Sequence, residues 1–236
     1  MEASIVIPTI NEAENIRILI PMIEEIFTIN NIQGQIIIVD DQSTDGTVQE
    51  AEELNKRYGN ILVISRKVKD GLGNALKTGV SRAEYENIIF MDADLSHEPK
   101  EIPEFLKALK EYDVVVGSRY LEQSRLKRTL TRKIVSGSYN LISRNILGVK
   151  VSDLTSGYRG FKKTTFDRLD IESKGPEIHS ELIVKASLAK EKVGEIPVTY
   201  VDRTHGQSKL NYMSIGPGYS KVILKALLSK ASKFLK

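Results

Sequence analysis

The sequence predicts an α/β fold with an open, mostly parallel sheet and helices on both faces. Short apolar runs rich in β-branched residues recur through the first half of the chain, as expected of parallel strands covered on both sides. Stretches of helical length separate these runs, so each strand leads through a helix to the next strand. Polar residues directly follow several runs, and ligands of such sheets bind beyond the carboxyl ends of the strands.

The order of these runs predicts one domain, residues 1–212, followed by a C-terminal helix, residues 213–236. The first half of the domain, residues 1–119, holds expected strands at 4–8, 36–39, 61–64, 88–91 and 114–116. It also holds expected helices at 12–27, 47–58 and 72–84, with another beginning at Pro99. The second half, residues 120–212, is expected to shape the site of a second substrate. Its expected elements are a helix at 130–147, a loop at 152–160, a helix at 178–190 and a strand at 193–198.

Composition excludes several kinds of site. The chain is 41% hydrophobic and 28% charged, which is typical of a globular protein. It has no cysteine and only three histidines, far apart in the sequence, so thiolate and multi-histidine metal sites are not expected. A bound metal would be a hard cation with oxygen ligands. A strand-like run follows Met1-Glu2 directly, and no apolar stretch reaches the roughly 20 residues of a spanning helix. We therefore expect no signal peptide and a soluble or peripheral protein.

Basic residues are concentrated in two blocks. No acidic residue follows Asp202, whereas seven lysines and arginines do, so the preceding residues are net acidic although the whole chain carries +3. A second acid-free stretch, residues 123–152, contains seven more basic residues. Such blocks indicate an anionic partner, which could be a membrane, a phosphate group or a nucleic acid. Two solvated surfaces are the alternative.

Asp92 and Asp94 directly follow the expected strand at 88–91. Two carboxylates one residue apart at a strand end can hold one divalent cation against a diphosphate, because Mg²⁺ takes one or two carboxylates plus phosphate oxygens. The alternative is that Asp92 caps a turn and Asp94 is solvated. At the end of a buried strand in this type of sheet, we favour the metal site.

Other strand ends are polar as well. Asp41 could accept hydrogen bonds from a base or ribose, or could order the turn before the helix that begins at Thr47. Asp45 is expected to have only the second kind of role, to order this turn and cap the helix. Glu12 could be a residue of a helix first turn. The stretch Gly71-Leu-Gly-Asn-Ala75 is not a dinucleotide loop, because it lacks the third glycine and a clear strand before it.

Seven motifs then appear in a fixed order: PTINEAEN, IVDDQSTDGT, DGLGNALKTG, MDADLSHEP, GSRY, SDLTSGYRGFK and DRTHGQSKL. Together they resemble the dolichol-phosphate mannose synthases, inverting glycosyltransferases with the GT-A fold, and the resemblance runs from about Ser4 to Leu210. It implies transfer of mannose from GDP-mannose to dolichyl or another polyprenyl phosphate at the cytoplasmic face of a membrane. It also implies a Mg²⁺ or Mn²⁺ cofactor.

The resemblance implies roles for individual residues. The donor site would comprise Pro8, Glu12, Val39, Asp41, Asp92, Ala93, Asp94, Arg119, Arg203 and Lys209. Within this set the metal ligands would be Asp92 and Asp94, and the residues closest to the reaction would be Asp94, Arg119, Arg203 and Lys209, the last three as phosphate contacts. Arg132 and Ser136 look like contacts of the acceptor phosphate. Two positions depart from the family pattern: Ile10 replaces a common Tyr, and Ser96 replaces the Gln of some members.

The chemistry agrees with this reading, because a lipid phosphate is already an anionic nucleophile at neutral pH. Alignment of the acceptor and stabilisation of the leaving diphosphate would then suffice, without a strong general base. Three alternatives stay open: the same transfer from UDP-glucose, a sugar-phosphate nucleotidyltransferase, and a non-enzymatic basic binder. Nucleotidyltransferases usually have a Gly-rich loop where this chain has Pro8-Thr-Ile-Asn11, and a basic binder leaves Asp92 and Asp94 unexplained. The chain has no Trp and the basic blocks contain few aromatic residues for stacking on bases, so no nucleic-acid partner is expected.

The end of the chain predicts an amphipathic helix. From Tyr219 onward, leucines and other apolar residues share one helical face and lysines the other, a pattern typical of helices that lie in a membrane interface. Packing on its own domain, or on a small membrane-spanning partner, are the alternatives.

Overall fold

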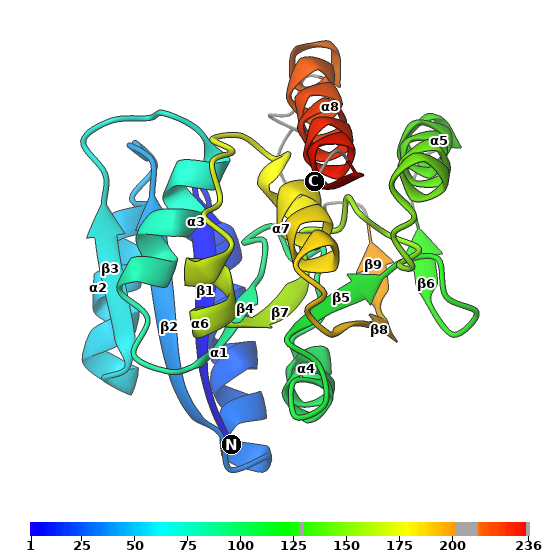
Figure 1. Cartoon of the computed structure of the whole chain (residues 1–236). Helices are drawn as coiled ribbons and strands as arrows, with labels where there is room; N and C mark the ends of the chain where they lie inside the picture. The colour runs from blue at the N-terminus through cyan, green and yellow to red at the C-terminus, as the bar shows by residue number, and fades with distance from the viewer. Residues whose placement is uncertain (128–129, 202–211, 235–236) are drawn as a thin grey trace.

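The computed structural model of the chain is organised around a seven-stranded sheet with the order β3-β2-β1-β4-β7-β5-β8 (Figure 1). The structure describes residues 1–127, 130–201 and 212–234. The strands of this sheet are β1 (Glu2–Thr9), β2 (Gln33–Asp40), β3 (Ile61–Ser65), β4 (Asn87–Phe90), β5 (Val114–Ser118), β7 (Arg159–Lys162) and β8 (Val193–Pro197). All their pairings are parallel except those of β7, which runs antiparallel between β4 and β5. The predicted open, mostly parallel sheet is confirmed.

Helices cover both faces of the sheet, because successive strand residues point to opposite sides. Ile5 and Ile7 face α1 (Ala13–Ile29), α2 (Thr47–Tyr58) and α4 (Ile102–Ala108), which follows the short 3₁₀ helix η1 (Pro99–Glu101). Val6 faces the other layer, where α3 (Leu72–Ser81), α6 (Lys163–Arg168) and α7 (Ile178–Leu188) pack. The near-continuous apolar character of the strands therefore results from burial on both faces.

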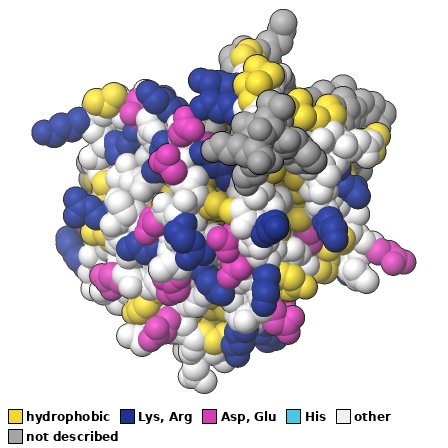
Figure 2. All heavy atoms as spheres, viewed as in Figure 1, with side chains coloured by type: hydrophobic (Ala, Val, Ile, Leu, Met, Phe, Trp, Pro, Cys, Tyr) yellow, Lys and Arg dark blue, Asp and Glu magenta, His cyan; other side chains and the backbone are white. Residues whose placement is uncertain are grey.

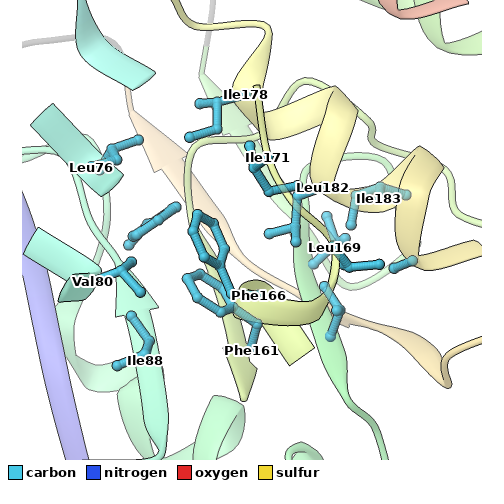
Figure 3. Close-up of a cluster of buried hydrophobic side chains, with 14 of the residues drawn as sticks. Leu76, Val80, Ile88, Phe161, Phe166, Leu169, Ile171, Ile178, Leu182 and Ile183 are labelled. Atoms are coloured by element: carbon cyan, nitrogen blue, oxygen red, sulfur yellow. The ribbon is translucent and has the colours of Figure 1, made fainter. Parts of the chain in front are cut away.

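An aromatic cluster fixes α7 to this second layer. The rings of Phe161 and Phe166 stack with centroids 5.1 Å apart, and Phe90 meets Phe161 edge-on at 4.7 Å. Figure 3 shows Phe161 and Phe166 between the apolar side chains of α3 and those of α7. Burial of large apolar side chains on both sides gives α7 a fixed position relative to the sheet.

The second half of the chain departs from expectation at β7. Residues 152–160 were expected to form a loop, but Arg159 begins a strand that completes the sheet between β4 and β5. Only Phe161 among its four residues is strongly apolar, so neither strand period nor apolar run marks it. Two further short strands, β6 (Arg125–Lys127) and β9 (Thr199–Val201), pair in parallel outside the main sheet.

Two long helices stand at the carboxyl end of the sheet, labelled α5 (Leu130–Leu147) and α8 (Tyr212–Phe234) in Figure 1. The bounds of α5 match those predicted. The helix α8 packs against α7 and α5, and it buries Val222 and Ala226. Its residues Leu224 and Leu228 are 58% and 62% exposed. None of the described helices is both long and apolar enough to cross a membrane.

Candidate active site

A cavity of about 460 Å³ lies beyond the carboxyl ends of β1, β2, β4 and β5. These four strands are parallel to one another, so the residues that follow them meet at one edge of the sheet. The first turn of α3, the first turn of α7, and single residues of β9 and α8 complete the wall. Segments from the whole length of the chain therefore form one site.

Most of the described residues predicted for the donor site line this cavity, namely Pro8, Glu12, Asp41, Asp92, Ala93, Asp94 and Arg119. Val39 does not, because its side chain is fully buried and packs toward α3 in the core. Arg132 and Ser136 lie on α5, but their side chains are outside the described part of the structure. Arg203 and Lys209 also lie outside the described residues.

The two aspartates at the end of β2 have different surroundings. Asp40 is fully buried, accepts from Thr9 Oγ1 at 3.0 Å and Ser43 N at 2.9 Å, and thus orders the turn before α2. Asp41 lines the cavity and forms an ion pair with Arg66 at 2.9 Å. Burial raises the pKa of the Asp41 carboxyl, and the ion pair opposes that rise. Of the two carboxylates, that of Asp41 lines the cavity and that of Asp40 does not.

Glu12 stands at the entrance to α1. Its backbone N–H donates to Thr47 Oγ1 at 2.9 Å, and its carboxylate accepts from Asn15 Nδ2 at 2.5 Å. Asp45 accepts hydrogen bonds from the N–H groups of Ala13 and Thr47, both at 3.0 Å. The N-cap residue of α2 is Gly46, so Asp45 orders the turn before the helix and is not its cap. These bonds tie the segments after β1 and β2 together on one side of the cavity.

His97 supports the acidic pair after β4. Its Nδ1 accepts from the backbone N–H of Asp92 at 3.1 Å, so its ring proton lies on Nε2. Burial lowers the pKa of His97, and its ring stacks on Tyr158 with centroids 4.7 Å apart. Asp94 accepts from Ser96 N at 3.1 Å and is 3% exposed. The turn is thus fixed by its own hydrogen bonds, and both carboxylates contribute to the cavity wall.

Asp92 and Asp94 fit a hard divalent cation. Gly157 leaves room beside them, because a Cβ there would lie 3.2 Å from Asp92 Oδ2. In the described part of the chain, no group of three or more His, Cys, Asp or Glu residues is arranged to hold a metal. Two carboxylates leave most coordination positions of Mg²⁺ or Mn²⁺ to a ligand's phosphate oxygens and water.

Arg119 is already engaged by an acid. Its Nε and Nη2 donate to Asp153 at 2.7 and 2.9 Å, and Nη2 also donates to Thr155 Oγ1 at 2.8 Å. Burial raises the pKa of Asp153, but Arg119 more than offsets this and holds that pKa below its ordinary value. The guanidinium therefore has a fixed orientation in the cavity wall, and its bonds to Asp153 and Thr155 use Nε and Nη2.

Residues 4–170 match glycosyl transferase family 2. The chain belongs to this family. It is therefore a glycosyltransferase, and its cavity is the candidate active site.

Two known proteins resemble the chain over most of its length. The undecaprenyl-phosphate mannosyltransferase of Micrococcus luteus is 31% identical over 224 residues, 92% of this chain and 90% of that protein. The dolichol-phosphate mannosyltransferase of Pyrococcus furiosus is 33% identical over 222 residues. That match covers 91% of this chain but 61% of the Pyrococcus protein, which is longer.

Solved structures show the same fold. Glucosyl-3-phosphoglycerate synthase from Mycobacterium tuberculosis, in complex with phosphoglyceric acid, superposes with a TM-score of 0.71 at 18% identity, over 96% of this chain and 80% of that one. Its complex with Mn²⁺, UDP-glucose and phosphoglyceric acid gives 0.69 at 18% identity, over 98% and 80%. At this identity the likeness concerns the fold alone.

Several wall residues of this glycosyltransferase were not predicted from the sequence, namely Lys69, His97, Thr155, Gly157, His179, Tyr200 and Tyr219. Thr155 and Gly157 lie in a motif that carried the family resemblance, so a signal for them existed. His179 and Tyr219 lie on α7 and α8, and only the packing of these helices brings the two side chains to the cavity.

Proposed function

We propose that the chain transfers a mannosyl group from GDP-mannose to dolichyl or another polyprenyl phosphate, with inversion. The observation that carries the proposal is the meeting of Asp41, the Asp92–Asp94 pair and Arg119 around one cavity. Such a site has a carboxylate for the nucleoside, two for a metal and a guanidinium for phosphate. The names of the Micrococcus and Pyrococcus relatives support the sugar and the class of acceptor.

The residues around the cavity can perform this reaction mainly by binding and alignment. Mg²⁺ or Mn²⁺ held by Asp92 and Asp94 would neutralise charge on the departing diphosphate. Arg119 offers a guanidinium whose direction Asp153 fixes, so little reorganisation is needed as charge develops. We assign Arg203 and Lys209 to the diphosphate, and Arg132 and Ser136 to the acceptor phosphate.

The acceptor phosphate can attack the sugar without a basic side chain. His97 and His179 both line the cavity, and burial lowers the pKa of each, so both are neutral at pH 7. His97 is not arranged as a base, because its Nδ1 is occupied by a backbone N–H and its protonated Nε2 lies 3.7 Å from a carboxylate oxygen of Asp92. An acceptor that is ionised in solution needs no such base.

We further propose that the protein acts as a peripheral protein on the cytoplasmic face of a membrane. Exposed Leu224, Leu227 and Leu228 of α8 lie near Lys221 and Lys225. Figure 2 shows hydrophobic side chains beside lysine and arginine side chains where Figure 1 places α8. This combination favours a helix that rests on an anionic lipid surface, although a small membrane-spanning partner could cover the same leucines.

The direct test is an assay of lipid-linked product. Purified protein would be incubated with undecaprenyl phosphate and either GDP-mannose or UDP-glucose, with Mg²⁺, with Mn²⁺ or with a chelator. We expect mannosyl lipid by mass spectrometry from GDP-mannose only, and none with chelator. Product from UDP-glucose alone would correct the donor, and no lipid product from any donor would contradict the proposal.

A further inference from the structure

Arg159 is a fully buried arginine at the start of β7. Its Nε donates to the carbonyl of Ser156 at 3.0 Å, and its Nη2 donates to the same carbonyl. Its Nη1 donates to the carbonyl of His179. Carbonyl oxygens satisfy its hydrogen bonds, but they carry no charge to balance the guanidinium. Among the described residues, no carboxylate forms an ion pair with it.

The charges around Arg159 do not cancel. The acid whose charge acts on Arg159 is Asp153, which is completely buried and bonded through both oxygens to Arg119. Two guanidinium groups therefore share one fully buried carboxylate. The other acids of this region, Asp92 and Asp94, lie in the cavity wall, where a bound divalent cation would neutralise them and leave one positive charge in excess. Burial lowers the pKa of Arg159 to about 9, so it still carries its charge at pH 7. An uncompensated buried charge is unfavourable unless something outside the cluster balances it.

This excess charge lies directly behind the cavity. Ser156 precedes Gly157, which lines the cavity against Asp92, and His179 lines it from the first turn of α7. The His179 anchor cannot move easily, because α7 is held by the aromatic and aliphatic cluster of Figure 3. Besides burial, the charge of Arg159 lowers the pKa of both His179 and His97, two residues of the cavity wall. The field of Arg159 therefore reaches the space where a ligand would bind.

We propose that Arg159 is a positioning residue of the donor site that also supplies the positive charge balanced by the diphosphate of the bound donor. Its three bonds hold the 156–157 loop and α7 at the separation that the cavity requires. A bound diphosphate supplies the negative charge that would balance Arg159. Because the guanidinium is already held in place at low dielectric, its attraction favours binding of the diphosphate. This inference rests on the proposed nucleotide-sugar donor.

The test compares nucleotides that differ by one phosphate group. Binding of GMP and GDP, and of UMP and UDP, would be measured by calorimetry with Mg²⁺ for the wild-type protein, Arg159→Gln and Arg159→Lys. Arg159→Gln keeps a hydrogen-bond donor and removes the charge, whereas Arg159→Lys keeps the charge and removes the planar fork. For Arg159→Gln we expect roughly tenfold weaker diphosphate binding and about threefold weaker monophosphate binding. For Arg159→Lys we expect the wild-type ratio of diphosphate to monophosphate affinity.

Equal losses for monophosphate and diphosphate in Arg159→Gln would show a merely structural role and overturn the inference, as would unchanged binding. If Arg159→Gln does not fold, Arg159→Lys still decides, because a fall in its diphosphate-to-monophosphate ratio would overturn the inference. If the wild-type protein binds neither nucleoside diphosphate, the inference falls together with the proposed donor class. Nucleotide binding with the expected ratios, but without lipid product, would overturn the proposed function and support the inference.

Discussion

Gly157 determines how closely the 152–158 loop approaches the carboxylates of the cavity. Its backbone does not need glycine for its own conformation, because it is not among the residues with positive φ. Its role is the contact: a Cβ would lie 3.2 Å and 3.4 Å from the two carboxylate oxygens of Asp92. A side chain larger than that of glycine at this position would therefore take space that the Asp92 carboxylate occupies.

Replacement of Gly157 by Ala should displace Asp92 by a few tenths of an ångström and weaken Mn²⁺-dependent donor binding about tenfold. Calorimetric titration with GDP-mannose and Mn²⁺ would measure the loss. Gly137→Ala, on α5 and with open space around its Cβ position, is the matched control and should bind normally. Equal binding by both variants would show that Asp92 is not a ligand.

Asp94 is 3% exposed and bonds Ser96 N, so it also stabilises its own turn. An alanine there would disturb the turn as well as the proposed metal site, which makes Asp94→Asn the cleaner change. The asparagine can keep the bond to Ser96 but loses the negative charge. We expect at least a roughly 100-fold loss of transfer with little change in unfolding temperature. Near-normal transfer by Asp94→Asn would exclude a metal role for this carboxylate.

The raised pKa of Glu101 should make the stability of the folded protein depend on pH. Its carboxylate accepts from Thr199 N at 2.7 Å, and burial raises its pKa to about 7. Because the folded-state pKa exceeds the ordinary value of 4.5, the folded protein binds the proton more tightly than the unfolded chain. Stability should therefore be highest below pH 4.5 as far as this group is concerned, and should fall as the pH rises to 7.

Glu101→Gln should abolish this loss, which we expect to be about 1–2 kcal/mol between pH 5 and pH 8. Urea unfolding at both pH values measures the difference. Glu104→Gln, on the exposed side of α4, is the control and should follow the wild-type pH dependence. Parallel pH profiles for Glu101→Gln and the wild type would contradict the assigned shift.

At the scale of elements, the first half of the chain was predictable because its signals are local. Strands β1 to β5 and helices α1 to α3 are each a run of the expected period, and their ends carry the expected polar residues. The strand β7 was not predictable, because its place in the sheet depends on partners that are distant in the sequence. Arg159 pairs with Phe90, about 70 residues earlier, and with Val116, about 45 residues earlier.

The helix α8 has two kinds of apolar residue. Val222 and Ala226 are buried against the domain, and Tyr219 lines the cavity, so deletion of the helix from Tyr219 would open the core and the site. Leu224 and Leu228 point outward instead. Point changes of these two leucines separate membrane attachment from folding, which deletion cannot do.

Leu224→Gln combined with Leu228→Gln should reduce co-sedimentation with phosphatidylglycerol vesicles at least tenfold, because each leucine contributes about 1.5–3 kcal/mol when buried in lipid. GDP-mannose binding should be unchanged. Ile29→Gln, at a residue of α1 that is 67% exposed, is the control and should leave sedimentation unaffected. Undiminished sedimentation of the double variant would place attachment elsewhere.

For the whole molecule, the proposed donor site has an incomplete set of metal ligands among the described residues. These residues provide two carboxylates for the proposed metal and a second buried guanidinium behind the proposed diphosphate position. Metal and nucleotide should therefore bind with strong mutual enhancement. Neither the charge excess nor the pairing of Arg119 with Asp153 follows from the sequence, since these residues meet only in the folded chain.

We expect 1 mM Mn²⁺ alone, or GDP alone, to raise the unfolding temperature little, and both together to raise it by several degrees. Differential scanning calorimetry of the wild-type protein and Asp94→Asn would measure this. The variant should show the nucleotide effect without the added metal effect. A large shift with Mn²⁺ alone would mean that the protein has a complete metal site of its own.

The neighbouring positions of β5 and β7 have a consequence for how members of the family can differ. Val116 pairs with Arg159, so the long excursion between these strands leaves the sheet and rejoins it at adjacent points. A segment whose two ends lie side by side in a rigid sheet can be replaced by another segment without a change in the sheet. We expect a chimera that contains residues 119–158 of a relative to use that relative's acceptor and the nucleotide of the parent protein. The choice of acceptor could then be changed by exchange of this one segment.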